Sequence, residues 1–464
     1  MNRYQSYLDP SQRTKVEQLV RGIQQAIREG RLTPGSKLPS IRAFAKEIGA
    51  SPFTVSEAYD RLVQEGWLAA RAGSGFYAQR KQQQSSGQAV RKQLSDLPLD
   101  GDWLLSGIYQ GEQQGILAGC GWLPASWYDD QAQVRALRKI AREQITEMTY
   151  GHPQGLLLLR EFLADKLSQQ GMSCHAEEIL LTQGATHALD IVCTTLRLDG
   201  TAVLIDNPGY CNLLSALRFR ECQLLPVNWT PQGPDLQQLE QLMQQHRPRV
   251  FFTNPWLHNP TGASYAPHIA HGVLRLAQQY DVLLVEDNVS ADLLAQGGPS
   301  LAAMDGLRQV LHIGSFSKAL SPALRVGYLL APARWQAALT RAKMLAALTS
   351  SSHTERLAYE LASDSKYKRQ NSRLIERIAQ STSKAVARFE QLGWQVFQPN
   401  SKSMFIWARP PQGVVIDQES ARQQQIFLAP GELFSSDGSS TPYYRFNAAY
   451  LDHTQFWHWL AAQQ

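Results

Sequence analysis

The chain has 464 residues, 43% of them hydrophobic and 18% charged, and its formal net charge is +5 at pH 7. This length exceeds the roughly 250–300 residues at which single hydrophobic cores stop growing, so we expect at least two domains. No stretch reaches the ~18 apolar residues of a membrane span, and the polar N-terminus lacks the apolar core of a signal peptide. We therefore expect a cytoplasmic protein with no membrane partner. Five cysteines without a Cys-x-x-Cys pair favour neither a disulfide framework nor a metal site.

The positive charge is concentrated near the N-terminus. Residues 1–100 contain 15 of the 45 Lys and Arg residues but only 9 of the 40 Asp and Glu residues, which leaves 30 against 31 in the rest. A basic module joined to a nearly neutral domain is typical of a protein that binds a polyanion.

Three short helices and a hairpin are predicted at the N-terminal end. Apolar residues at helical spacing predict helices over 16–27, 41–48 and 52–65, the last two each preceded by a serine suited to the N-cap. Residues 67–71 and 76–78 are predicted to form two strands joined by a glycine-containing turn. Two short helices joined by a glycine turn and followed by a hairpin indicate a winged helix-turn-helix.

Several motifs in this region carry a family resemblance. They are Leu38-Pro39-Ser40-Ile41-Arg42, Ser51-Pro52-Phe53-Thr54-Val55, Glu65-Gly66 and Gly73-Ser74-Gly75. With them, residues 1–80 resemble the GntR family of bacterial DNA-binding domains. The resemblance implies double-stranded DNA as a partner, with the third helix in the major groove and the wing at the minor groove. The DNA-binding residues it implies are Arg42, Ser51, Phe53, Thr54, Arg71, Gly73 and Gly75. Ser51 is needed as a helix cap in any case, and Arg42 is equally consistent with a solvated surface position.

The stretch after this module differs in composition. Residues 81–100 are rich in glutamine and serine and have no apolar periodicity, which predicts a flexible linker. We therefore expect a DNA-binding domain at 1–80, a linker at 81–100 and a large effector domain at 101–464.

Apolar runs alternate with helical patterns in the large domain. Runs at 201–206, 250–253, 282–286 and 310–313 predict an α/β fold with a mainly parallel sheet that is buried on both faces. Ligands bind such sheets at the carboxyl ends of the strands, so the polar residues there are candidates for a site. These candidates lie at 206–210, 258–262, 287, 314–318 and 325.

The residue types at these strand ends suit a phosphorylated aromatic cofactor. Lys318 is able to form a Schiff base with an aldehyde, and Asp287 is able to keep a pyridine nitrogen protonated. Ser315, Ser317 and Arg325 together are suited to neutralise a phosphate.

In their order and spacing these motifs resemble the fold-type I aminotransferases, which use pyridoxal 5'-phosphate (PLP). The resemblance implies PLP as the cofactor, with Lys318 as the catalytic lysine that binds it covalently. It also implies that Asp287 contacts the pyridine nitrogen, that Asn259 donates to the phenolic oxygen, and that Tyr210 stacks on the ring. Arg445 corresponds to the arginine that holds the α-carboxylate of a substrate or effector. The implied phosphate ligands are Gly184, Ala185, Thr186, Ser315, Ser317, Arg325 and, across a homodimer interface, Tyr150.

One departure from that family concerns a tyrosine. Aminotransferases carry it a few residues after the pyridine-binding carboxylate, where its hydroxyl helps to set the pKa of the lysine–cofactor linkage. Here Asp287 is followed by Asn288, Val289 and Ser290, and the serine side chain is much shorter. We therefore expect at most weak PLP-dependent transaminase activity.

A winged helix fused to an aminotransferase-like domain resembles the MocR subfamily of GntR transcriptional regulators. The resemblance implies a homodimer that binds DNA and senses PLP, a B6 vitamer or an amine. A working PLP-dependent aminotransferase is the alternative, and a DNA-binding protein with an empty large domain is a third possibility. The fused module, the N-terminal charge and the missing tyrosine favour the regulator, whereas the intact surroundings of Lys318 argue against the third.

Overall fold

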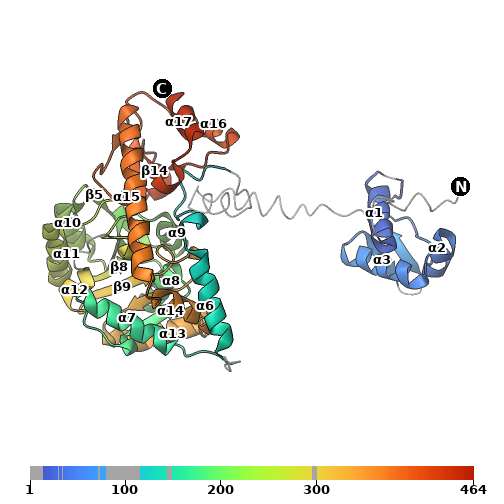
Figure 1. Ribbon diagram of the computed structural model, residues 1–464, viewed down its shortest axis with the longest axis horizontal. Coiled ribbons are helices and arrows are strands. Elements are labelled where there is room, and N and C mark those ends of the chain that lie inside the picture. The colour runs from blue at the N-terminus through green and yellow to red at the C-terminus, as the bar shows by residue number, and fades with distance from the viewer. Residues whose placement is uncertain are drawn as a thin grey trace. The chain divides into compact units, whose positions relative to one another are not determined.

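The computed structural model divides the chain into two compact units between Leu97 and Pro98 (Figure 1). It describes residues 14–29, 31–33, 35–71, 74–79, 115–143, 149–294 and 300–463. The predicted linker at 81–100 and the predicted DNA contact by Gly73 lie outside these residues. Within the described ranges, no helix is long and apolar enough to cross a membrane. All five cysteines are buried and free.

The N-terminal unit is a winged helix-turn-helix, as predicted. Its elements are α1 (Lys15–Arg28), α2 (Ile41–Ile48), α3 (Pro52–Gln64), β1 (Leu68–Arg71) and β2 (Gly75–Ala78). Both serine caps are present, because Ser40 Oγ accepts the N–H of Ala43 and Ser51 Oγ accepts the N–H of Thr54. Strands β1 and β2 form an antiparallel hairpin. The unit has its own hydrophobic core, which includes Leu19, Ile23, Phe44, Val55, Tyr59, Leu62 and Trp67.

An eight-stranded mixed sheet forms the centre of the second unit. In spatial order its strands are β3 (Ile179–Thr182), β10 (Gly327–Leu330), β9 (Val310–Ser315), β8 (Leu283–Asp287), β7 (Val250–Thr253), β4 (Ala202–Asn207), β5 (Gln223–Thr230) and β6 (Gly233–Pro234). Strands β9, β8, β7, β4 and β5 are parallel neighbours, whereas β10 and β6 run antiparallel to their partners. The predicted mainly parallel sheet is therefore confirmed.

Helices cover both faces of this sheet, because alternate strand residues point to opposite sides. One face packs against α8 (Ala185–Leu196), α9 (Cys211–Phe219) and α13 (Ala333–Ala347). The other packs against α6 (Asp130–Arg142), α7 (Leu157–Gln169), α10 (Leu236–His246), α11 (Pro267–Tyr280), α12 (Leu301–Asp305) and α14 (Ser352–Ala362). Leu204 of β4 belongs to the second core and its neighbours Val203 and Ile205 to the first.

A second, smaller sheet follows, which the sequence analysis did not predict. Its antiparallel strands, in spatial order, are β11 (Gln395–Val396), β12 (Phe405–Arg409), β14 (Tyr444–Asn447) and β13 (Ala429–Pro430). Helices α15 (Tyr367–Gln391), α16 (Gln418–Gln423) and α17 (Thr454–Ala461) accompany it, and α15 is the long orange helix of Figure 1. Because α15 contacts both this sheet and the turn after β8, it ties the small sheet to the strand ends of the large one.

Candidate cofactor and effector site

The carboxyl ends of the parallel strands bring Asp287 and Lys318 to one edge of the large sheet. Asp287 ends β8, and Lys318 lies three residues beyond the end of β9. Strands β8 and β9 are paired in register, with Asp287 opposite Ile313. The two side chains interact electrostatically, so each charge favours the charged form of the other.

The Asp287 carboxyl is buried and incompletely bonded. Its side chain is 7% exposed, and its Oδ1 has no hydrogen-bond partner within the described residues. Burial raises its pKa to about 6. Asn254, which the sequence analysis missed, fixes the surrounding backbone, because its Nδ2 donates to the backbone oxygen of Asp287 and its Oδ1 accepts the N–H of Asn259 at 2.8 Å. Its position directly after β7 was the signal available in the sequence.

Replacing Asp287 with asparagine should stabilise the protein measured without added ligand. A carboxyl with a pKa near 6 in the folded state and near 4 when unfolded destabilises the fold at neutral pH by about 2–3 kcal/mol. This destabilisation of the folded state is absent below pH 4, grows as the pH rises from 4 to 6, and stays constant above pH 6. Thermal unfolding of the wild type and the variant at several pH values should therefore show that Asp287→Asn melts several degrees higher at pH 7 and at the same temperature near pH 4. A difference in melting temperature that does not change with pH would contradict this prediction.

Lys318 has the features of a reactive amine. Burial, and then the positive charge of Arg445, lower its pKa to about 8, so a larger fraction is neutral at physiological pH than for an exposed lysine. Its Nζ donates to the backbone oxygen of Gly121. A neutral lysine amine is a nucleophile toward carbonyl groups.

Arg445 is a buried guanidinium held without a carboxylate. It is 1% exposed in the middle of β14, and no ion pair to it occurs within the described ranges. Its Nη1 donates to Asn259 Oδ1 at 2.8 Å, its Nη2 donates to the backbone oxygen of Gly119 at 2.6 Å, and its Nε has no partner among the residues described. The guanidinium lies 5.0 Å from the ring centre of Phe405 and 4.7 Å from that of Phe434. Because one guanidinium forms two parallel hydrogen bonds with a carboxylate, this group suits a carboxylate ligand.

The N-terminus of α8 and Arg325 form an anion-binding corner. Gly184 is the N-cap of α8 with φ +83°, and no side chain caps the helix. A Cβ at Gly184 would lie 2.6 Å from Arg325 Nη2, and one at Gly327 would lie 2.7 Å from the carbonyl carbon of Gly184. Glycine at these two positions thus allows Arg325 and the backbone of β10 to lie close to the start of α8. The first N–H groups of α8, those of Ala185 and Thr186, have no side-chain cap among the described residues and lie beside a guanidinium, which favours a phosphate.

The two predicted serines lie at the end of β9. Ser315 Oγ donates to Ser317 Oγ at 3.0 Å and accepts the N–H of Ser317 at 3.1 Å. Ser315 is buried and Ser317 is half-buried. The pair therefore holds a compact loop that leads directly into Lys318.

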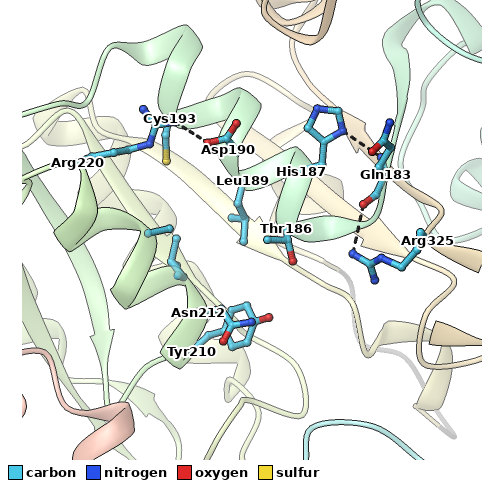
Figure 2. Close-up of a pocket in the computed structure, with 12 residues that line it drawn as sticks. Gln183, Thr186, His187, Leu189, Asp190, Cys193, Tyr210, Asn212, Arg220 and Arg325 are labelled. Carbon is cyan, nitrogen blue, oxygen red and sulfur yellow. Dashed lines mark hydrogen bonds and ion pairs between the residues drawn. The ribbon is translucent and has the colours of Figure 1, made fainter. Parts of the chain in front are cut away.

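A pocket of about 530 Å³ lies between α8 and α9 (Figure 2). Figure 2 shows Thr186 on α8 and Tyr210 at the start of α9 lining it, with Arg325 on one side and Arg220 on the other. Its remaining lining residues are Gln183, His187, Leu189, Asp190, Cys193, Asn212, Leu213 and Ala216. The structure thus places the predicted Thr186, Tyr210 and Arg325 around one cavity.

Tyr150 does not join this site within one chain. It is 81% exposed, lies ahead of α7 and does not line the pocket. Ser290, at the position where a tyrosine was expected, is buried in the turn after β8. The predicted contact of Tyr150 with a phosphate requires a second subunit and stays a prediction.

The segment around Gly119 and Gly121 was missed by the sequence analysis. Its backbone oxygens accept from Arg445 and Lys318, and Asn447 Nδ2 donates to the backbone oxygen of Trp122 at 2.7 Å. A Cβ at Gly119 would lie 2.3 Å from the backbone nitrogen of Ala429, so glycine is required there. Two glycines two residues apart ahead of α6 were the signal available in the sequence.

The predicted DNA-binding residues occupy the tips of two helices and the wing. Ser51, Phe53 and Thr54 form the start of α3, and Phe53 is 77% exposed. Arg42 is exposed in the first turn of α2. On the wing, Gly75 and Arg71 are exposed, with the Arg71 guanidinium 4.5 Å from the ring centre of Tyr77.

Comparison with known proteins agrees with this arrangement. Residues 123–460 match the family described as aminotransferase class I and II. The chain belongs to this family. Residues 15–78 match the family described as bacterial regulatory proteins, gntR family, which covers the winged helix. This combination confirms the resemblance to the MocR subfamily of GntR regulators.

The relatives of this chain include both a protein named as a transcriptional regulator and proteins named as aminotransferases. The chain is 27% identical over 450 residues to the uncharacterized HTH-type transcriptional regulator YdcR of Escherichia coli, covering 94% of this chain and 95% of the relative. It is 29% identical over 352 residues to 2-aminoadipate transaminase of Thermus thermophilus, covering 74% of this chain and 87% of the relative. The crystal structure of the aminotransferase LysN of Thermus thermophilus, complexed with N-(5'-phosphopyridoxyl)-L-leucine, superposes with a TM-score of 0.69 at 24% identity over 77% of this chain and 93% of that one.

Proposed function

We propose that this protein is a PLP-binding transcriptional regulator of the MocR type. The observation that carries the proposal is the presence of both families in one chain, the gntR match at 15–78 and the aminotransferase match at 123–460. Full-length similarity to a protein named as a transcriptional regulator supports it. The winged helix binds DNA, and the large unit binds the small molecule to which the regulator responds.

The residues of the site fit PLP on three observations. Among the residues that the structure describes, Asp287 Oδ1 is buried and has no partner, Arg325 and the N-terminus of α8 form an anion-binding corner, and Lys318 has a lowered pKa. Bound PLP supplies an aldehyde that joins covalently to a lysine amine and a ring that withdraws electrons when its nitrogen is protonated. Lys318 provides the amine, and Asp287 holds a proton at the ring nitrogen. Asn259 and Tyr210 orient the ring.

The phosphate and the effector are held by separate cations. Arg325, the first N–H groups of α8 and the hydroxyls of Ser315 and Ser317 bind the phosphate, and the partner's Tyr150 reaches it in a homodimer. Arg445 binds the carboxylate of an amino-acid-like effector, because it is buried and pairs with no carboxylate in the part of the chain that the structure describes. A carboxylate held by Arg445 would bring the amine of the effector toward Lys318, since the charge of Arg445 acts on Lys318.

A catalytically active aminotransferase is the second candidate function. The similarity to a protein named 2-aminoadipate transaminase favours it. Against it stands Ser290, which occupies the position where aminotransferases carry the tyrosine that helps to set the pKa of the lysine–cofactor linkage. Hydrogen bonding and proton transfer by one positioned group typically contribute ~10²–10⁴ in rate. We therefore propose at most weak transaminase activity.

The test compares DNA binding with turnover in the same preparation. We expect PLP with a mixture of amino acids to change the affinity of the full-length protein for its DNA by about 5–150-fold, the usual range of allosteric coupling. Turnover of the same amino acids should stay far below the enzyme median of about 10 per second. Electrophoretic mobility shifts and a coupled transaminase assay measure the two quantities.

An Arg445→Met variant is the matched control for this test. It removes the guanidinium but keeps an apolar side chain against Phe405 and Phe434, so PLP should still bind while the response to carboxylate-bearing amines is lost. A turnover number near the enzyme median, together with a DNA affinity that no ligand changes, would instead support a working aminotransferase.

A further inference from the structure

The first turn of α3 exposes an aromatic ring that the fold of the N-terminal unit does not use. Phe53 is 77% exposed and is the only exposed large hydrophobic side chain among the described residues of this unit. The phenylalanine and the tyrosine of its core, Phe44 and Tyr59, are 1% and 0% exposed. A large apolar side chain displayed singly on a small domain is therefore a candidate for contact with a partner.

The polar groups around Phe53 are already engaged with each other. Ser51 Oγ accepts the N–H of Thr54 at 3.0 Å, and the two hydroxyls share a further hydrogen bond of 2.8 Å. Pro52 has no N–H to offer. The ring of Phe53 is thus the most prominent recognition group at this helix end, and it is an apolar one.

We propose that Phe53 reads the C5-methyl group of a thymine in the major groove, an inference that rests on the proposed DNA-binding function. The N-terminal residues of a recognition helix contact base edges. A base edge in the major groove offers hydrogen-bonding groups or, for thymine alone, a methyl group. A phenylalanine ring forms no hydrogen bond with those groups, so thymine is the base it distinguishes.

The charges on the same unit favour DNA as the occupant. Arg42 at the start of α2 and Arg71 on the wing are exposed cations suited to the phosphates of the backbone. Glu57 lies one turn after Phe53 on the same helical face and is also exposed. A carboxylate is repelled by phosphates but accepts a hydrogen bond from the amino group of cytosine. This face of α3 therefore suits base edges rather than the backbone.

The test removes the methyl group from the DNA and the ring from the protein. A duplex is first selected from a random pool by the full-length protein, and each thymine is then replaced in turn by uracil, which lacks only the methyl group. At one or more positions the affinity of the wild-type protein should fall about fourfold, the effect of one buried methyl group. Phe53→Ala should bind the thymine duplex more weakly by at least that factor and show no further loss with uracil. Phe53→Leu, which remains apolar, should regain part of the difference.

Phe219→Ala is the matched control, since Phe219 is a 92% exposed phenylalanine in the other unit. This substitution should leave the affinities for the thymine and the uracil duplex unchanged. Equal thermal midpoints of the variants exclude unfolding as the cause. Equal responses of wild type and Phe53→Ala at every thymine would overturn the proposal, as would normal DNA affinity of Phe53→Ala combined with a changed oligomeric state. Failure of the full-length protein to enrich any duplex would instead overturn the DNA-binding function on which the proposal rests.

Discussion

Replacing Lys318 with alanine should abolish the visible absorbance of bound PLP and the trapping of PLP by borohydride. The amine of Lys318 lies at the strand ends beside Asp287, and its pKa of about 8 leaves part of it neutral at pH 7. Below pH 8 the neutral fraction rises about tenfold per pH unit and then levels off, so the rate of cofactor attachment should follow the same profile. Stopped-flow absorbance between pH 6 and pH 9 measures this profile.

The chain contains a closely matched control for this prediction. Lys343 on α13 is 0% exposed, and burial likewise lowers its pKa to about 8, but the charges that act on it are those of Glu355 and Arg160 and not that of Asp287. Lys343→Met should therefore keep both the absorbance and the trapping. If PLP remained trapped in Lys318→Ala, or were lost only in Lys343→Met, the assignment of the reactive lysine would be wrong.

The strand-end residues could be predicted because the parallel sheet itself determines where they lie. Uncharged runs predict the strands, and carboxyl ends of parallel strands meet at one edge, so Asp287 and Lys318 are expected to be neighbours from sequence alone. These predictions depend on local patterns, which the structure reproduces to within one or two residues. Gly184, in contrast, is predicted as a phosphate ligand only through the resemblance to the fold-type I aminotransferases.

Contacts between distant segments could not be predicted in this way. Lys318 bonds the backbone of Gly121 across 197 residues, and Arg445 bonds that of Gly119 across 326. The two glycines indicate a close approach of the chain, but a backbone acceptor has no residue type, so the sequence does not say which side chains donate to it. The burial of Arg445 depends on the small sheet, whose strands β11 and β13 have two residues each and therefore lack a detectable periodicity. Tyr150 differs from both, because its contact with the phosphate of a second subunit is implied by the resemblance alone and stays a prediction.

A tethered pair of winged helices should bind DNA far more tightly than one alone. The N-terminal unit has its own core and capped helices, so a fragment of residues 1–80 should fold. In the full-length homodimer that we propose, binding of one winged helix places the second at a high effective concentration. Linked modules of this kind gain ~10²–10⁴ in affinity without any new contact. The fragment should therefore bind the selected duplex more weakly by at least about 10²-fold.

The salt dependence of the DNA affinity distinguishes the gain from tethering from the contribution of the contacts that each winged helix makes. Each neutralised phosphate lowers log K by ~0.9 per decade of salt, so a dimer that engages two half-sites should show about twice the slope of the fragment. Footprinting of both proteins at two salt concentrations measures affinity and slope together, and the linker predicted at 81–100 would permit either direct or inverted half-sites. A full-length Arg42→Gln variant serves as the control, since it should reduce the slope while the gain from tethering remains. Equal affinities of fragment and full chain would mean that the large unit does not join two winged helices, and the regulator would then have to act as a monomer on DNA.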